Sequence, residues 1–395
     1  MLDTPFPPWP SFTDEEADRI KSVLLSNRVN YWTGEECRLF ELEFADWVGV
    51  NHAIALGNGT QALELALKAL QLKPGEEVVV TPRTFLASAS AIVAVGAVPV
   101  FADIDPDSQN ITAETIRPVL TERTRAIICV HLAGWPCDMT PILQLANEHG
   151  IWVVEDCAQA HGARYRGQSV GSIGHIGAWS FCQDKIMSTG GEGGMVTTND
   201  PELWARMWSY KDHGKNYEKV RSPHHPPGFR WLHDSFGTNW RMTEIQAAIG
   251  RIQLRRMGDW HQRRLQNAKQ IWTTASSLKG LRVPDVPDHI EHAAYKCYVF
   301  VDTHALPAGV NRDEICAAVN RAGVPCYTGS CSEIYLEKAF DGTGWRPAHR
   351  LPVARQLGES ALMFLVHPTL EQHHIDKTGQ VLTQVMEQTF ACTLH

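Results

Sequence analysis

The sequence predicts an α/β fold with a mostly parallel central sheet, followed by a smaller α+β domain. Apolar, β-rich runs alternate with helical stretches from about Asn51 to Asp200, which is the rhythm of βαβ units. These runs are so apolar that both faces of the sheet must be covered. The length of 395 residues also favours two domains over one.

The elements of the large sheet follow one another in regular order. Strands are expected at HAIAL (52–56), EVVVTP (77–82), VPVFADI (98–104), AIICVHL (126–132), IWVVED (151–156), GAWSFC (177–182) and GGMVTTN (193–199). Helices are expected between them at 60–72, 85–96 and 139–149. The helix at 60–72 is apolar almost all round, which fits a helix packed inside an α/β layer.

A long helical pattern at 243–272 grows more charged toward its end and is expected to link the domains. We place the large domain at 1–255 and the small domain at 256–395. The small domain should contain a strand at 296–303 and helices at 312–323 and 375–388, so that helices cover a small sheet. The Pro- and Gly-rich segment 222–231 is too irregular to assign.

Composition excludes several classes of function. A net charge of -8 with scattered Lys and Arg leaves no basic surface for nucleic acid. The start lacks a basic and then apolar leader, and no later apolar run is long enough to cross a bilayer, so a cytoplasmic protein is expected. None of the ten cysteines forms CxxC, which supports neither a disulfide framework nor a metal site.

Gly57–Thr60 follows the strand at 52–56 and opens a helix. Free backbone N–H groups and the positive helix end converge there, so Gly59 and Thr60 are candidate phosphate ligands. An isolated GNGT is more often only a turn with an N-cap.

Asp156 ends the strand IWVVED, and ligands bind at the carboxyl ends of strands in such sheets. A carboxylate there can hold a pyridine nitrogen protonated, which makes a pyridoxal phosphate (PLP) ring an electron sink. Gln159 could donate to the phenolate oxygen of the ring. Taken alone, Asp156 would more often be a capping or salt-bridged residue.

Lys185 follows the strand GAWSFC and is the candidate catalytic residue, because an aldehyde cofactor needs an amine that can shed its charge. Ser180 could reach a phosphate oxygen, and Phe85 could stack on the ring. Glycines 190, 191, 193 and 194 allow close backbone approach, although a flexible or bulged loop is an equal alternative. Each signal is weak alone, yet their order assembles one cofactor site from successive strand ends.

At these residues the sequence resembles the DegT/StrS family of nucleotide-sugar aminotransferases, whose fold is that of aspartate aminotransferase (fold type I of the PLP enzymes). The resemblance runs nearly end to end. It rests on GNGTQALELAL, VVEDCAQAHGARYRGQSVGSIGHIGAWSF, Lys185 with GGEGGMVTTND, GTNWRMTEIQAAIGRIQL and LPVARQLGESALMFLVHPTL.

The resemblance implies PLP held as a Schiff base on Lys185, and a homodimer in which Asn239 contacts the cofactor phosphate of the neighbouring subunit. Glutamate would donate its amino group to a keto group of a nucleotide-linked sugar, with C4 of a 4-keto-6-deoxy sugar favoured and C3 as the alternative. Arg241, Tyr31 and Tyr327 are candidate substrate contacts.

Two features bear on this implication. Relatives that dehydrate or deoxygenate sugars place a histidine at the lysine position, whereas this chain keeps Lys185. Many members have tyrosine and proline ahead of the lysine, whereas this chain has SFCQDKIM, which leaves the substrate subclass open. A PLP-binding regulator without turnover and a purely structural α/β protein are the other classes considered.

Overall fold

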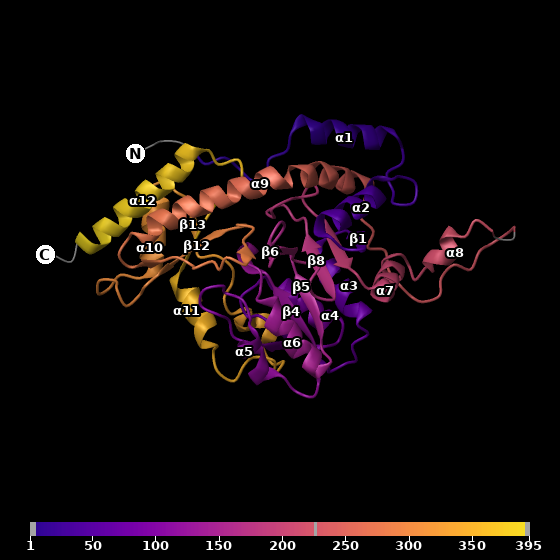
Figure 1. Cartoon of the computed structure of the whole chain (residues 1–395), viewed down its shortest axis with the longest axis horizontal. Helices are drawn as coiled ribbons and strands as arrows, with labels where there is room; N and C mark the ends of the chain where they lie inside the picture. Colours follow the sequence, from indigo (N-terminus) through magenta and orange to yellow (C-terminus); the bar gives the residue numbers. More distant parts are fainter. Residues whose placement is uncertain (1–4, 225–226, 392–395) are drawn as a thin grey trace.

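The computed structural model describes residues 5–224 and 227–391 (Figure 1). Its large sheet has the strand order β1-β9-β8-β5-β4-β2-β3. Within this sheet, β9 alone runs opposite to the other six strands, so the predicted mostly parallel sheet is confirmed. The strands are β1 (His52–Leu56), β2 (Glu77–Val80), β3 (Val98–Phe101), β4 (Thr124–Val130), β5 (Trp152–Asp156), β8 (Ile176–Ser180) and β9 (Gly194–Thr198).

Helices cover both faces of this sheet, as its apolar strands require. In β2, Val78 and Val80 pack into a core with α3 (Gly59–Ala69), α4 (Ala87–Ala94) and α7 (Pro201–Lys211). Val79, which points the other way, packs against α5 (Ala113–Ile116) and α6 (Met139–His149). The all-round apolar α3 touches β8, β9, α4 and α7, which confirms a helix inside an α/β layer.

The carboxyl-terminal part forms a smaller antiparallel sheet of order β10-β12-β14-β13. Its strands are β10 (Leu281–Arg282), β12 (Cys297–Val301), β13 (Cys326–Tyr327) and β14 (Ala361–Phe364). Helices α10 (Arg312–Arg321) and α12 (Gln372–Ala391) accompany it, as the sequence predicts, and α11 (Pro352–Ser360) is an additional helix. A third small sheet joins β11 (Ile290–Glu291), β6 (Arg164–Tyr165) and β7 (Gln168–Ser169).

Helix α9 (Glu244–Ser276) runs from the large sheet to the small one, with α1 (Asp14–Leu25) and α12 lying along it (Figure 1). The predicted domain boundary at residue 255 falls inside this helix. Phe6, from the amino-terminal segment, packs against the core of the small sheet, so the amino-terminal segment contacts the predicted small domain. The boundary therefore stays a prediction.

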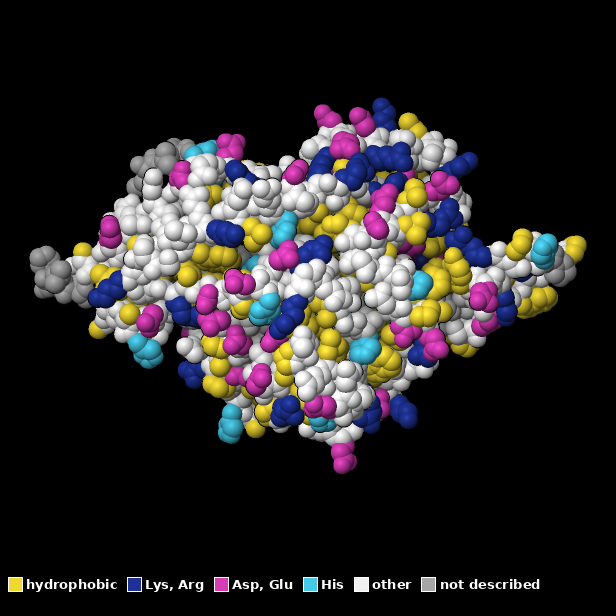
Figure 2. Space-filling view, in the orientation of Figure 1, with side chains coloured by type: hydrophobic (Ala, Val, Ile, Leu, Met, Phe, Trp, Pro, Cys, Tyr) yellow, Lys and Arg dark blue, Asp and Glu magenta, His cyan; other side chains and the backbone are white. Residues whose placement is uncertain are grey.

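An arm projects from the large sheet beside α8 (Tyr217–Arg221) (Figure 1). It contains the segment 222–231 that the sequence left unassigned; residues 225 and 226 lie outside the described part, and the rest form no helix or strand. Three large apolar side chains of the arm are exposed, namely Phe229 by 77%, Trp231 by 80% and Phe236 by 100%. Figure 2 shows hydrophobic side chains gathered along this projection.

Within the described residues, nine cysteines are free thiols and six of them are buried. No helix in the described part has the length and apolar character needed to span a membrane.

A carboxylate from α9 caps a distant helix. Glu244 Oε2 accepts from the backbone N–H of Glu36 at 2.5 Å, and Oε1 accepts from that of Cys37 at 3.2 Å. These are the first N–H groups of α2 (Glu36–Val48), whose own N-cap residue makes no side-chain hydrogen bond. Glu244 is buried, so it replaces a local N-cap and joins α9 to α2.

We expect Glu244→Ala to lower the free energy of unfolding by roughly 1.5–3 kcal/mol, because two N–H groups lose a charged acceptor in a buried place. Urea unfolding followed by circular dichroism measures this change. Asp259→Ala removes an exposed carboxylate from the same helix and should leave the free energy nearly unchanged. Equal losses in the two variants would contradict the assigned cap.

Candidate functional site

The strand directions bring several predicted site residues to one edge of the large sheet. Strands β8, β5, β4 and β2 are mutually parallel, and β1 shares their direction because β9 is antiparallel to both β1 and β8. Their carboxyl ends therefore meet at the same edge, which is where open α/β sheets bind ligands.

The turn after β1 forms an open anion site. Asn58 caps α3 by accepting from the N–H of Gln61 at 2.9 Å, whereas the N–H groups of Gly59 and Thr60 have no acceptor among the described residues. A Cβ at Gly59 would lie 2.5 Å from that of Ser180, so the turn rests directly on the end of β8. The Ser180 hydroxyl accepts from Cys182 N–H at 3.3 Å and keeps its proton for a ligand.

Asp156 is buried at the end of β5 and lies in a short polar chain. Its Oδ2 accepts from Ser88 Oγ at 2.9 Å, its Oδ1 accepts from Ala158 N–H at 3.1 Å, and Ser88 Oγ lies 3.0 Å from Thr84 Oγ1. Burial raises the pKa of Asp156, although these hydrogen bonds and the charge of Lys185 oppose the rise. A cationic ligand beside this carboxylate would restore its ionised form.

Sequence reasoning missed Ser88, which orients this carboxylate. Ser88 lies in TPRTFLAS, three residues after Phe85, and the only signal for it in the sequence is a hydroxyl in the first turn of the helix that follows β2. Phe85 itself is 71% exposed at the carboxyl end of β2, where its ring is open to contact a planar ligand. Gln159 is buried and its Oε1 accepts from Ala133 N–H at 2.8 Å, which leaves its amide N–H groups to donate.

Lys185 follows β8 and is mostly covered, with its side chain 16% exposed. Its Nζ lies 3.6 Å from Asp184 Oδ1 and 5.4 Å from the centre of the Tyr295 ring. Trp9 Nε1 donates to the Lys185 backbone carbonyl at 2.8 Å, so the amino-terminal segment holds this loop in place. The lysine is thus anchored through its backbone while its amine stays available.

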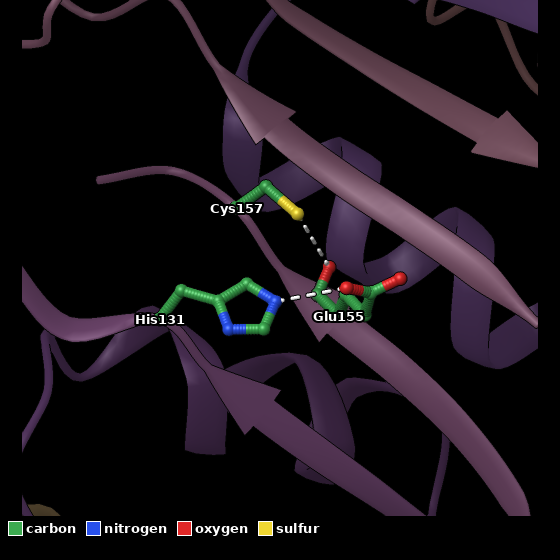
Figure 3. Close-up of side chains that lie close together, drawn as sticks. All are labelled: His131, Glu155 and Cys157. Carbon is green, nitrogen blue, oxygen red and sulfur yellow. Dashed lines mark hydrogen bonds and ion pairs between the residues drawn. The ribbon is translucent and has the colours of Figure 1, made fainter. Parts of the chain in front are cut away.

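Buried groups flank Asp156 on the opposite side of the strand. Glu155 Oε2 lies 2.9 Å from His131 Nε2 (Figure 3). Glu155 Oε1 accepts from two backbone N–H groups, at residues 173 and 174. Since His131 Nδ1 accepts from Cys137 N–H, its proton resides on Nε2. Burial raises the pKa of the Cys157 thiol, which makes it a poor metal ligand. His131, Glu155 and Cys157 therefore act as scaffold for β4 and β5.

The remaining candidate site residues lie in different parts of the structure. The Asn239 side chain is exposed, and the next residue, Trp240, accepts at its carbonyl from Gly57 N–H, so Asn239 lies close to the phosphate turn of its own chain. Arg241 is paired with buried Asp212 at 2.7 Å. Tyr327 is half exposed and lines a cavity with Asp184.

Tyr31 is not gathered with the other site residues. It is buried, its hydroxyl donates to Glu41, and its ring lies under Lys211 Nζ at 3.8 Å. Tyr31 and Glu41 line a separate pocket beside α2 and α7, and neither Lys185 nor Asp156 is among the described residues of its lining.

The residues at the carboxyl-terminal edge of the large sheet fit PLP. The free N–H groups of α3 and the Ser180 hydroxyl suit a phosphate, buried Asp156 suits a protonated ring nitrogen, and Gln159 suits a phenolate oxygen. An amine near Asp156 suits an aldehyde carbon. A parallel sheet with this edge, followed by a small domain, defines a PLP-dependent enzyme of fold type I.

The chain belongs to the DegT/DnrJ/EryC1/StrS aminotransferase family, which it matches over residues 10–383. It is therefore a PLP-dependent aminotransferase, which settles the choice between an enzyme and a structural or regulatory protein. The solved structure of the aminotransferase from Psychrobacter cryohalolentis is 59% identical, with a TM-score of 0.96 over 98% of this chain and 100% of that one.

Two curated relatives are also similar along most of their length. The dTDP-3-amino-3,4,6-trideoxy-alpha-D-glucose transaminase of Streptomyces venezuelae is 33% identical over 89% of this chain and 87% of its own. The UDP-N-acetyl-3-dehydro-alpha-D-glucosamine 3-aminotransferase of Acidithiobacillus ferrooxidans is 35% identical over 91% of this chain and 90% of its own.

We expect Asp156→Asn to keep PLP bound but to lower kcat by roughly 10²–10³-fold, the usual loss for removing one preorganised charge. Ser88→Ala keeps the carboxylate and should cost only about tenfold, as for one hydrogen bond. Absorbance of bound PLP and steady-state rates measure the two effects separately. Near wild-type turnover in Asp156→Asn would mean that the carboxylate has only a structural role.

Proposed function

We propose that this aminotransferase moves an amino group from glutamate to a keto group of a nucleotide-linked sugar. The observation that carries the proposal is the convergence of Lys185, Asp156 and the open amino end of α3 at one sheet edge. The similarity to relatives named for dTDP-linked and UDP-linked sugars supports a nucleotide sugar as the acceptor.

Each residue has a distinct task in this reaction. PLP, when bound, supplies an electron sink for the charge that develops on the reacting carbon. Asp156, oriented by Ser88 and Ala158 N–H, would hold the proton of the ring nitrogen. Lys185 Nζ would take the proton from the substrate carbon and return it on the neighbouring side. Phe85 would cover one face of the ring.

The carbon that carries the keto group defines the subclass of acceptor sugar. We propose C4 of a 4-keto-6-deoxy sugar, as the sequence resemblance implies. C3 is the second candidate, and it is favoured by the two relatives above, whose names specify a 3-amino or 3-dehydro sugar. Amino-sugar or polysaccharide biosynthesis is the corresponding cellular role.

We further propose that the working unit is a homodimer with shared active sites. The exposed aromatic side chains of the arm form an apolar surface of the kind that monomers rarely leave uncovered. Asn239 lies where this arm returns to the large sheet, and it presents an exposed amide. In the proposed dimer, that amide would donate to the cofactor phosphate of the partner subunit.

Incubation with glutamate and a panel of 3-keto and 4-keto sugars on dTDP, UDP and GDP tests the reaction directly. We expect one 4-keto sugar nucleotide to be aminated with release of 2-oxoglutarate, and Lys185→Ala to be inactive because it lacks the reacting amine. Mass spectrometry detects the products. Amination of 3-keto sugars alone would overturn the C4 assignment, and amination of none would overturn the proposed function.

Borohydride reduction followed by peptide mapping identifies the lysine that binds PLP. Lys296 is the informative competitor, since burial, Arg264 and Lys185 lower its pKa to about 8, so that a fraction of it is neutral near pH 7. A phosphopyridoxyl group on Lys185 is the expected result. Its presence on Lys296 would show that the catalytic lysine is misassigned.

Mixing two inactive variants tests the shared site. Lys185→Ala and Asn239→Trp each disable both sites of their own homodimer, but in a heterodimer one site carries both changes and the other carries neither. Random exchange should therefore restore about a quarter of wild-type activity, by counting sites in a twofold dimer. If native mass spectrometry shows heterodimers and activity stays absent, Asn239 acts within its own chain.

A further inference from the structure

A cavity of about 220 Å³ opens beside Lys185, where the amino-terminal segment, α9 and the small sheet meet. It is lined by Trp9, Asp184, Arg264, Tyr295, Lys296 and His367, with Tyr327 also on its wall. Asp184 and Tyr295 contact Lys185 directly, so the cavity adjoins the reacting amine. None of the charged residues in the lining of this cavity has a role in the reaction proposed above.

Arg264 is the unusual member of this lining. It is only 1% exposed, yet its Nε and Nη2 have no hydrogen-bond partner among residues 5–224 and 227–391, and Nη1 makes a single long hydrogen bond of 3.4 Å to the Tyr295 carbonyl. Burial lowers its pKa to about 9, so it remains a cation at neutral pH. A buried guanidinium without an anion is costly, which indicates that a ligand supplies the missing charge.

Arg264 Cζ lies 4.9 Å from the centre of the Trp9 ring, but the described lining of the cavity offers its guanidinium no free anion. Among the described residues, Asp184 is the one acidic side chain in the lining, and it is engaged by the Tyr295 hydroxyl and by Lys185. Lys296 adds a second cation to the same wall. His367 is neutral, because burial and the nearby charges of Arg264 and Lys296 lower its pKa to about 3. The cavity is therefore positively charged, and it contains hydrogen-bond donors that have no acceptor among the described residues.

We propose that this cavity binds one carboxylate of the amino donor, with Arg264 and Lys296 as its ligands. The proposal rests on glutamate being the donor, as proposed above. A guanidinium fork matches the two oxygens of a carboxylate, and the donor must place its reacting carbon next to Lys185. The volume favours a carboxylate over a nucleoside diphosphate, because pockets for larger ligands usually measure about 300–1,000 Å³.

Binding of glutarate to the PLP-loaded enzyme tests this assignment without turnover, since glutarate has both carboxylates of glutamate but no amine. Arg264→Gln should weaken glutarate binding at least about tenfold in calorimetry, the effect of losing one charge-assisted hydrogen-bonded contact. It should raise the KM for glutamate similarly and leave the KM for the sugar nucleotide unchanged. Lys269→Gln removes an exposed charge from α9 and should change neither.

Two further arms keep the test decisive. If Arg264→Gln weakens binding of dTDP, UDP or GDP alone rather than glutarate, the cavity serves the acceptor and the proposal is overturned. If Arg264→Gln does not fold by circular dichroism, Lys296→Gln takes its place, and unchanged glutarate affinity there overturns the proposal. Glutarate binding needs no acceptor, so these outcomes are independent of the sugar panel that tests the function.

Discussion

The close backbone contact between the turn at 58–59 and the β8–β9 pair is the constraint on which the site depends. Gly59 rests on Ser180, and a Cβ at Gly194 would lie 2.3 Å from the Asn58 carbonyl oxygen. Neither position tolerates a side chain without a shift of backbone. This contact holds the phosphate turn, the serine and the strand that leads to Lys185 in one rigid unit.

Local patterns in the sequence predict the elements that build this unit. The strand at 52–56 and the helix at 139–149 have the predicted bounds, because an apolar run or an amphipathic period is a property of neighbouring residues. Asp156 was predicted at a strand end for the same reason. The short strands β6, β7 and β11 were not predicted, since two-residue strands carry no periodic signal.

Contacts between distant residues could not be predicted in this way. Ser88 looks like a helix residue until the fold brings it to Asp156, and Arg264 looks like one more charge on a long polar helix. The contacts of Tyr31 with Glu41 and Lys211 likewise have no signal in the sequence around it, and its role as a substrate contact stays a prediction. Burial and pairing depend on tertiary packing, which residue spacing does not encode.

Helix α9 has a mechanical consequence. Its 33 residues make a continuous rod of about 50 Å, with the Glu244 cap at one end and Arg264 two-thirds of the way along. The edge residues that fit PLP all belong to the large sheet, whereas the cavity beside Lys185 has walls from both sheets. A small rotation of the carboxyl-terminal part about this rod would resize the cavity and leave the phosphate turn undisturbed. Such a rotation would let one reactant leave and the next bind while PLP remains bound at the phosphate turn.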